Sequence, residues 1–285
     1  MPCNIARHFL NHPHTMFKNL LTISLFLLII SSCEQQVKNN QPSKELSIEA
    51  KKKARIQEES ITKAGVDILF RKDSLQFSTS QKKMIQKIIH DAEKNIRKLL
   101  PTLPKNIKVI VYTTPIKLEQ VGGVSGRAAR NNTALVFLEV SRTHPSGITS
   151  VIKNGFAATV YHEFHHLYRG WAIRDNKFRQ GIDIATINEG LAVVFSEIYT
   201  GAIEEGNAYL KGTHKWVDEI LKLPKNADYG KWMFEHPDGR TAIGYRTGNY
   251  IITKVMEKSK KSILELSKLS PKEIYKLAGY ELLNQ

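Results

Sequence analysis

The residues best suited to chemistry lie in one short run, Thr159 to Leu167, which contains His162, Glu163 and His166. On a helix, side chains four positions apart lie one above the other on the same face. Two imidazoles at this spacing can bind one Zn²⁺, and the glutamate between them lies beside the metal as a potential general base. The alternative is a pair of structural histidines that hydrogen-bond to neighbouring groups. The elements around the run must decide between them.

The apolar residues around the motif predict an amphipathic helix. They recur at helical spacing as Ala157, Val160, Phe164, Leu167 and Trp171. Because each helical residue advances by about 100°, His162 and His166 fall roughly opposite this stripe. We therefore expect a packed back face and a metal-binding front face. His165 points away from both histidines, so we expect it to hydrogen-bond nearby or to line the cleft.

A catalytic zinc site needs three protein ligands and an open fourth position. The extended pattern H-E-x-x-H-x-x-G-x-x-H is absent, because Gly170 falls one residue late and the residues that follow it, as far as Asp175 and Asn176, include no histidine. Glu189 is the remaining candidate, and its alternative is an exposed helix carboxylate. It lies on a second helical pattern, whose apolar face is Ile184, Ile187, Leu191, Val194, Phe195 and Ile198.

Together these motifs resemble known enzymes. The H-E-x-x-H run followed by Asn188–Ala192 (N-E-G-x-A) is similar to the gluzincin metallopeptidases, whose third ligand is such a glutamate. More closely, His162–His166, the glutamate motif and Gly244–Gly248 resemble a bacterial family described only as predicted zinc-dependent proteases. The resemblance covers about Leu75 to Tyr280. The first two motifs are specific together, and the third is weak alone.

The resemblance implies that His162, His166 and Glu189 bind Zn²⁺ and that Glu163 is the general base in peptide-bond hydrolysis. One position departs from the pattern. Thermolysin-like enzymes carry an aspartate four residues after the ligand glutamate, to hold a histidine ligand, where this chain has Val193. The partner of the histidine ligands is therefore open, with Asp183 and Glu197 as the alternatives.

Peptide hydrolysis also needs a donor or a positive charge to stabilise an anionic tetrahedral intermediate. The candidates are Tyr245, Arg246, Tyr250 and His236. Tyr245 is the first choice, because a tyrosine has this role in several gluzincins and because it opens a predicted helix over Thr241 to Met256. Each candidate has a surface or core residue as its alternative.

The surrounding elements predict an α+β fold. Helical spacing predicts a helix that ends before Pro101, and β-branched runs predict strands over Ile107 to Thr113 and Thr133 to Val140. The segment Val121 to Gly126 lacks the spacing of a phosphate-binding loop and is interpreted as a turn that leads into a strand. Pro271 to Leu283 begins with a capping box and is expected to be a packing helix.

The resemblance implies a zincin-like arrangement of these elements. A small sheet is expected to pack on the H-E-x-x-H helix, with the second helix carrying Glu189. Many zincins pair an extended substrate with an edge strand above the active helix, and Thr133 to Val140 is the expected edge strand.

The N-terminal residues predict export and lipid attachment. The apolar run Leu20 to Ile30 is too short to cross a bilayer but fits a secretory signal. It leads into Cys33 through small residues, as in the lipobox of bacterial lipoproteins; an ordinary signal peptide is the alternative. Translation starts either at Met1 or at Met16, from which the signal is already complete. The only other cysteine is Cys3, which excludes a disulfide framework in the folded domain.

The expected organisation is a signal peptide and lipobox over 1–33, a tether and N-terminal segment over 34–74, and a zincin-like catalytic domain over 75–285. The net charge of +15 is spread along the chain without a nucleic-acid-binding motif, so it indicates a solvated surface. The sequence thus predicts a zinc metallopeptidase anchored to a membrane of the bacterial cell envelope through Cys33, outside the cytoplasm. The competing hypothesis is a non-catalytic zinc-binding or partner-binding lipoprotein.

Overall fold

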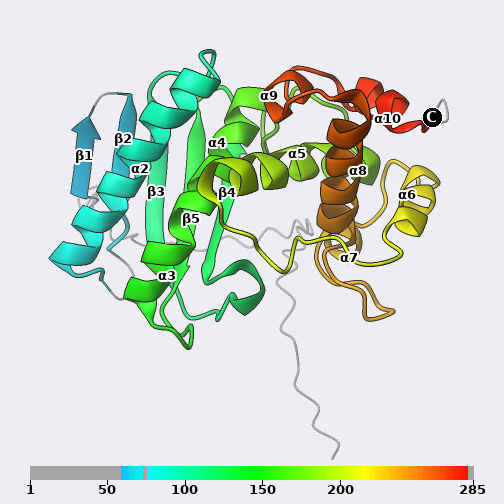
Figure 1. Cartoon of the computed structure of the whole chain (residues 1–285). Helices are drawn as coiled ribbons and strands as arrows, with labels where there is room; N and C mark the ends of the chain where they lie inside the picture. The colour runs from blue at the N-terminus through cyan, green and yellow to red at the C-terminus, as the bar shows by residue number, and fades with distance from the viewer. Residues whose placement is uncertain (1–58, 64, 73–75, 282–285) are drawn as a thin grey trace, which may run out of the picture. The chain divides into compact units, whose positions relative to one another are not determined.

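Five strands form one mixed sheet in the order β1-β2-β3-β5-β4 (Figure 1). The strands are β1 (Glu59–Lys63), β2 (Val66–Phe70), β3 (Ile107–Thr114), β4 (Val124–Arg130) and β5 (Leu135–Ser141). β2 and β5 run parallel to β3, whereas β1 and β4 pair antiparallel with their neighbours at the two edges. The computed structural model describes residues 59–63, 65–72 and 76–281.

Three helices cover one face of this sheet (Figure 1). They are α2 (Thr79–Leu99), α3 (Ile148–Asn154) and α4 (Phe156–Arg169). Alternate residues of β3, Ile107, Val109 and Val111, are fully buried beneath them, as expected when successive side chains point to opposite faces. The capping box at Ser78 starts α2, and the helix ends before Pro101 as predicted.

The other helices lie after α4 in the chain and build the second half of the domain (Figure 1). They are α5 (Ile182–Thr200), α6 (His214–Leu221), α7 (Tyr229–Met233), α8 (Ile243–Ser259), α9 (Ile263–Leu266) and α10 (Pro271–Ala278). α5 packs on both α4 and α8 and thereby joins the two halves. Apart from Ile198, which is 49% exposed, its predicted apolar face is buried.

The predicted edge strand is wrong. The strand over Leu135–Ser141 is present, but β5 lies between β3 and β4, so β4 forms the edge instead. The reason is that the segment Val121 to Gly126, interpreted as a turn, already enters a strand at Val124, and this strand, β4, pairs antiparallel with β5. Pairing with β5 overrode the low strand propensity of glycine.

Two boundaries also differ from expectation. Strands β1 and β2 belong to the sheet, although they precede residue 75, where the predicted catalytic domain begins. The helix at Pro271 ends at Ala278, because Gly279 adopts a left-handed conformation there. The predicted signal peptide, Cys33 and most of the predicted tether and N-terminal segment lie outside the described residues, so these predictions are not tested. Within the described residues, no helix has both the length and the apolar content needed to cross a membrane.

Candidate metal centre

Two helices bring the three predicted ligands to one point. His162 and His166 project from α4, and Glu189 projects from α5. The Nε2 atoms of the two histidines lie 2.9 Å apart, and Oε2 of Glu189 lies 3.1 Å from His162 Nε2 and 3.0 Å from His166 Nε2. Glu189 is 4% exposed, so it is not the surface carboxylate that was its alternative.

The donor set of this cluster fits a zinc ion. Two imidazole nitrogens and one carboxylate oxygen are typical zinc ligands, and three of them leave a fourth position open. The cluster formed by His162, His166 and Glu189 is placed to share one ion. Beside it, Glu163 is buried, and its Oε2 atom has no hydrogen-bond partner in the structure. A buried carboxylate oxygen without a partner is costly, which points to a ligand or a water at this position.

Burial and charge give the two carboxylates different protonation behaviour. Burial acts to raise the pKa of Glu189, but the adjacent His166 and His162 hold it well below its usual value. Glu189 therefore remains an anion and can serve as a ligand. Burial raises the pKa of Glu163 to about 7, although the nearby His162 opposes the rise. A carboxyl group with a pKa near neutrality is suited to taking and releasing protons.

A glycine in the edge strand makes room for Glu163. A Cβ atom at Gly126 of β4 would lie 2.5 Å from Cγ of Glu163 and 2.8 Å from Cγ2 of Thr159. β4 therefore approaches α4 more closely than a side chain would allow. The N–H of Ala128, two residues further along β4, donates to the Glu163 carboxylate. In the sequence, the glycine-rich segment Val121 to Gly126 is the only indication that β4 approaches α4 so closely.

Among the described residues, Nδ1 of His166 has no hydrogen-bond partner. The ligand Glu189 does have an outer partner, Trp171, which helical spacing had placed in the packing stripe. Its indole Nε1 donates to Oε1 of Glu189 at 2.9 Å. Trp171 lies beyond the end of α4, where Gly170 turns the chain at φ 77°, so helical spacing no longer applied. The two predicted partners bond elsewhere: Asp183 pairs with Arg179, and Glu197 accepts from Asn249 at 3.3 Å.

Tyr245, in the first turn of α8, also lies at the metal centre. Its ring centroid is 6.4 Å from that of His162. Burial raises the pKa of its hydroxyl well above the usual value, and Glu189 and Glu163 add to the rise. The hydroxyl therefore keeps its proton and can act as a donor.

The other three candidates for this role have different surroundings. Arg246 donates to the carbonyl of Ala208, Tyr250 packs against Tyr209, and His236 pairs with Asp238.

Tyr229, which begins α7, is a site residue that no sequence pattern predicted. Its hydroxyl interacts with the Glu189 carboxylate and with Tyr245, and burial raises its pKa far above the usual value. No local pattern marked this residue, because α7 is a five-residue helix whose position is set by packing against α5 and α8.

The weak motif Gly244–Gly248 has a structural explanation. A Cβ atom at Gly190 of α5 would lie 2.3 Å from the backbone carbon of Gly248, and one at Gly248 would lie 2.1 Å from the oxygen of Thr186. α5 and α8 therefore cross with their backbones in contact. This crossing fixes α8, and with it Tyr245, above the metal ligands.

His165 faces away from the ligands, as its position on the helix predicted. It is fully buried, and its Nε2 atom lies 2.9 Å from Oγ of Ser267. Burial lowers the pKa of its imidazole well below the usual value. His165 is therefore a neutral residue that ties α4 to the C-terminal segment.

One family model agrees with this centre. The family described as Predicted Zn-dependent protease (DUF2268) matches residues 85–276, which is more than half of the chain. Among solved structures, an aminopeptidase N family protein from Idiomarina loihiensis aligns with a TM-score of 0.40 and 12% identity. That alignment covers 79% of this chain and 41% of the other. The search of curated proteins found no match.

Zinc, the expected cofactor, agrees with both the family description and the cluster of His162, His166 and Glu189. The chain belongs to the family of predicted Zn-dependent proteases.

Proposed function

We propose that this protein is a zincin-like, gluzincin-type zinc metallopeptidase that hydrolyses peptide bonds in a peptide or protein substrate. The observation that carries the proposal is the convergence of two imidazole nitrogens and one carboxylate oxygen beside a buried carboxyl group with a free oxygen. A centre that only held zinc would need the three ligands but no base. Glu163 supplies that base.

His162, His166 and Glu189 would hold the ion, which when bound polarises a carbonyl group and lowers the pKa of a water molecule. Glu163 takes the proton of the attacking water at Oε2, the oxygen that has no hydrogen-bond partner. The same oxygen then hands the proton to the leaving amine. The Ala128 N–H holds the carboxylate in place during both transfers.

Tyr245 is proposed as the donor to the developing oxyanion. Its hydroxyl keeps its proton, because burial and the neighbouring carboxylates raise its pKa. A neutral donor already in position requires little reorganisation as negative charge develops on the substrate oxygen.

β4 is proposed as the strand that aligns the substrate. Its outer edge is partly covered, because the N–H of Ile173 bonds to the carbonyl of Ala128 and that of Arg174 to Ala129. The part nearer Gly126 lies beside Glu163. An extended peptide that adds to this part of the edge would bring its backbone to the base.

Zinc content and hydrolysis must be measured on the same preparations. We expect about one zinc per wild-type chain and cleavage of some members of an unbiased peptide library. Glu163→Gln should retain zinc and lose at least about 10³-fold in kcat/KM, because only the proton acceptor is removed. The matched control is Glu257→Gln, an exposed glutamate of α8, which should change neither quantity.

Two other outcomes would contradict parts of this proposal. Zinc without hydrolysis in the wild type would favour a non-catalytic zinc-binding protein that retains the site. Wild-type protein that holds no stoichiometric zinc after purification without chelators would overturn the metal centre itself.

We further propose that the protein is a lipoprotein of the bacterial cell envelope, anchored through Cys33 outside the cytoplasm. Support comes from the signal-like run before Cys33 and the small residues next to it. Intact mass of the mature protein tests this: it should begin at Cys33 and carry acyl groups, and Cys33→Ser should remove them. A mature chain cleaved elsewhere, without acyl groups, would contradict the anchor.

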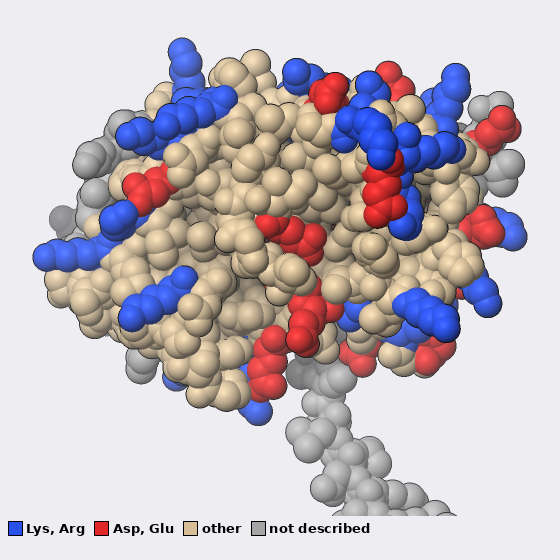
Figure 2. Space-filling model, in the orientation of Figure 1, with Lys and Arg blue, Asp and Glu red and all other residues tan. Residues whose placement is uncertain are grey.

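A nucleic-acid partner is not proposed, despite the net charge of +15. Figure 2 shows acidic side chains along the middle of one face, with most Lys and Arg side chains around its edges. Phosphate binding needs a continuous basic stripe instead.

A further inference from the structure

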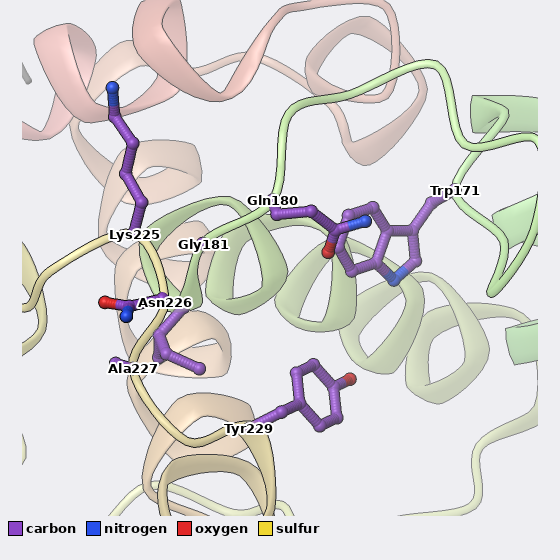
Figure 3. Close-up of a pocket in the computed structure, with 8 residues that line it drawn as sticks. Trp171, Gln180, Gly181, Lys225, Asn226, Ala227 and Tyr229 are labelled. Carbon is purple, nitrogen blue, oxygen red and sulfur yellow. The ribbon is translucent and has the colours of Figure 1, made fainter. Parts of the chain in front are cut away.

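A cavity of about 470 Å³ lies beside the metal centre (Figure 3). Two segments far apart in sequence form it: the chain between α4 and α5, and the turn before α7. The residues that line it are Trp171, Gln180, Gly181, Ile182, Lys225, Asn226, Ala227 and Tyr229. Its volume falls within the range of pockets that bind small ligands.

The surface of this cavity is mostly apolar and aromatic, and Gln180, Asn226 and Lys225 are the polar residues of its lining. The rings of Trp171 and Tyr229 stand on one side of it, and Ala227 lies across from them (Figure 3). Ile182 is 3% exposed and completes the apolar wall. Lys225, the one charged residue of the lining, extends away from the two rings, so its ammonium group does not enter the space between them.

The two aromatic residues connect the cavity to the metal centre. Trp171 donates its indole N–H to Oε1 of Glu189 at 2.9 Å. The hydroxyl of Tyr229 interacts with the same carboxylate and with Tyr245. Each residue thus directs a polar edge to the ligand and an apolar ring to the cavity. A group in the cavity is therefore one aromatic ring away from a metal ligand.

The apolar surface continues outside the cavity. Phe234 is 59% exposed and Tyr229 is 41% exposed, and their rings pack edge to face with centroids 5.9 Å apart. Large apolar side chains that remain exposed next to a cleft are typical of a surface that contacts a ligand. Between the two rings, which Lys225 does not reach, a charged side chain would lose water without meeting an opposite charge from the lining residues.

We propose that this cavity is the subsite for a large apolar side chain, preferably aromatic, of a substrate residue adjacent to the scissile bond. The proposal rests on the proposed function, because it assigns a specificity to that same site. Aromatic rings pack well against other rings in offset or edge-to-face contacts, which favours phenylalanine and similar residues over branched or charged ones.

The test compares binding and cleavage in the zinc-loaded full chain. Binding is measured by calorimetric titration with N-acetyl-phenylalaninamide, using N-acetyl-lysinamide and N-acetyl-aspartamide as alternatives. The phenylalanine probe should bind at least about tenfold more tightly than either charged probe. Cleavage is measured on peptides that differ only at the two residues flanking the cleaved bond. At one of these positions, phenylalanine should give the highest kcat/KM.

Ala227→Trp fills the cavity and should weaken binding of the phenylalanine probe by at least about tenfold. It should lower kcat/KM for the phenylalanine peptide by a similar factor, and by several-fold more than it lowers kcat/KM for an alanine peptide. Lys222→Trp, on the exposed surface just before the same turn, is the matched control and should change neither. Ile182→Ala provides a second test, because enlarging the cavity should shift preference towards larger rings. Circular dichroism and zinc content check that each variant folds.

Equal binding of the three probes, or a phenylalanine preference that Ala227→Trp and Ile182→Ala both leave unchanged, would overturn the subsite. A preference for the lysine probe would instead assign the site to a basic side chain and would also overturn it. Selective binding without any cleavage would support the cavity and contradict the peptidase. The two proposals can therefore fail separately.

Discussion

Helix α5 contacts its two neighbours in opposite ways, through consecutive residues. Towards α4 it presents Glu189, whose long polar side chain meets His162 and His166. We call this contact the ligand interface. Towards α8 it presents Gly190, whose missing side chain lets Gly248 touch the backbone. We call this second contact the glycine interface.

The difference shows how one helix serves two purposes. The ligand interface keeps buried polar groups together, which is stable only when they share hydrogen bonds or an ion. The glycine interface brings two backbones together at Gly190 and Gly248 and is stabilised there by close packing. The first supplies the metal ligands. The second sets the distance at which α8 carries Tyr245 over them.

The largest effect is expected from a variant that disrupts only the ligand interface. His166→Ala removes one of three ligands and should abolish stoichiometric zinc binding and lower kcat/KM at least about 10³-fold. Metal analysis and a peptide assay measure the two losses. His214→Ala, an exposed histidine in the first turn of α6, should behave as wild type. Full zinc binding by His166→Ala would show that the three side chains are not the ligand set.

The second largest effect is expected from a variant that disrupts the glycine interface. In Gly248→Ala the new Cβ would lie 2.1 Å from the oxygen of Thr186. Backbone cannot move aside cheaply, so the free energy of unfolding should fall by about 3 kcal/mol. Urea denaturation measures this. Gly230→Ala is the control, because its Cβ would meet only Asp228 Oδ1, at 3.3 Å. Equal stability of the two variants would mean that the helices are not held in backbone contact.

A smaller effect, on zinc affinity, is expected from a variant that leaves the three ligands of the ligand interface in place but removes an outer hydrogen bond. Trp171→Phe keeps an aromatic ring but removes the N–H that orients Glu189. Loss of such an outer partner should weaken zinc affinity by about tenfold, measured by competition with a chelator. Trp216→Phe removes an indole N–H from α6, away from the ligands, and should leave the affinity unchanged. Affinity equal to wild type in Trp171→Phe would exclude an orienting role.

The smallest effect concerns the far end of the glycine interface, where Asn249 of α8 bonds to Glu197 of α5. Burial, with the nearby Glu204, raises the pKa of Glu197 to about 7. The folded state therefore holds a proton that the unfolded state releases near pH 4.5, so stability decreases as pH rises from about 4.5 to above 7.

Glu197→Gln should remove this dependence. Because Glu197 is partly solvated, the variant should gain only about 1 kcal/mol over wild type at pH 8 and nothing at pH 4. Thermal melts across this pH range measure the difference. A constant difference between wild type and variant at all pH values would contradict the shifted pKa.

The sequence by itself determined the features that depend on local spacing. A helical period placed His162 and His166 on one face, and a second helical pattern placed Glu189 on another helix. The same local rules predicted the helix that ends before Pro101 and the strands over Ile107 to Thr113 and Thr133 to Val140, which the structure places at residues 107–114 and 135–141. These features need only a few neighbouring residues to be specified.

Only the tertiary structure decided the features that depend on contacts between distant segments. Pairing with β5 made the glycine-rich segment an edge strand, because ladder hydrogen bonds outweighed local propensity. The turn at Gly170 moved Trp171 out of the helical stripe and onto Glu189. Tyr229 reaches the same carboxylate across 40 residues of chain, from Glu189 to α7. No helical or strand periodicity in the sequence predicts these contacts between distant residues, because they arise from the way in which buried surfaces pack.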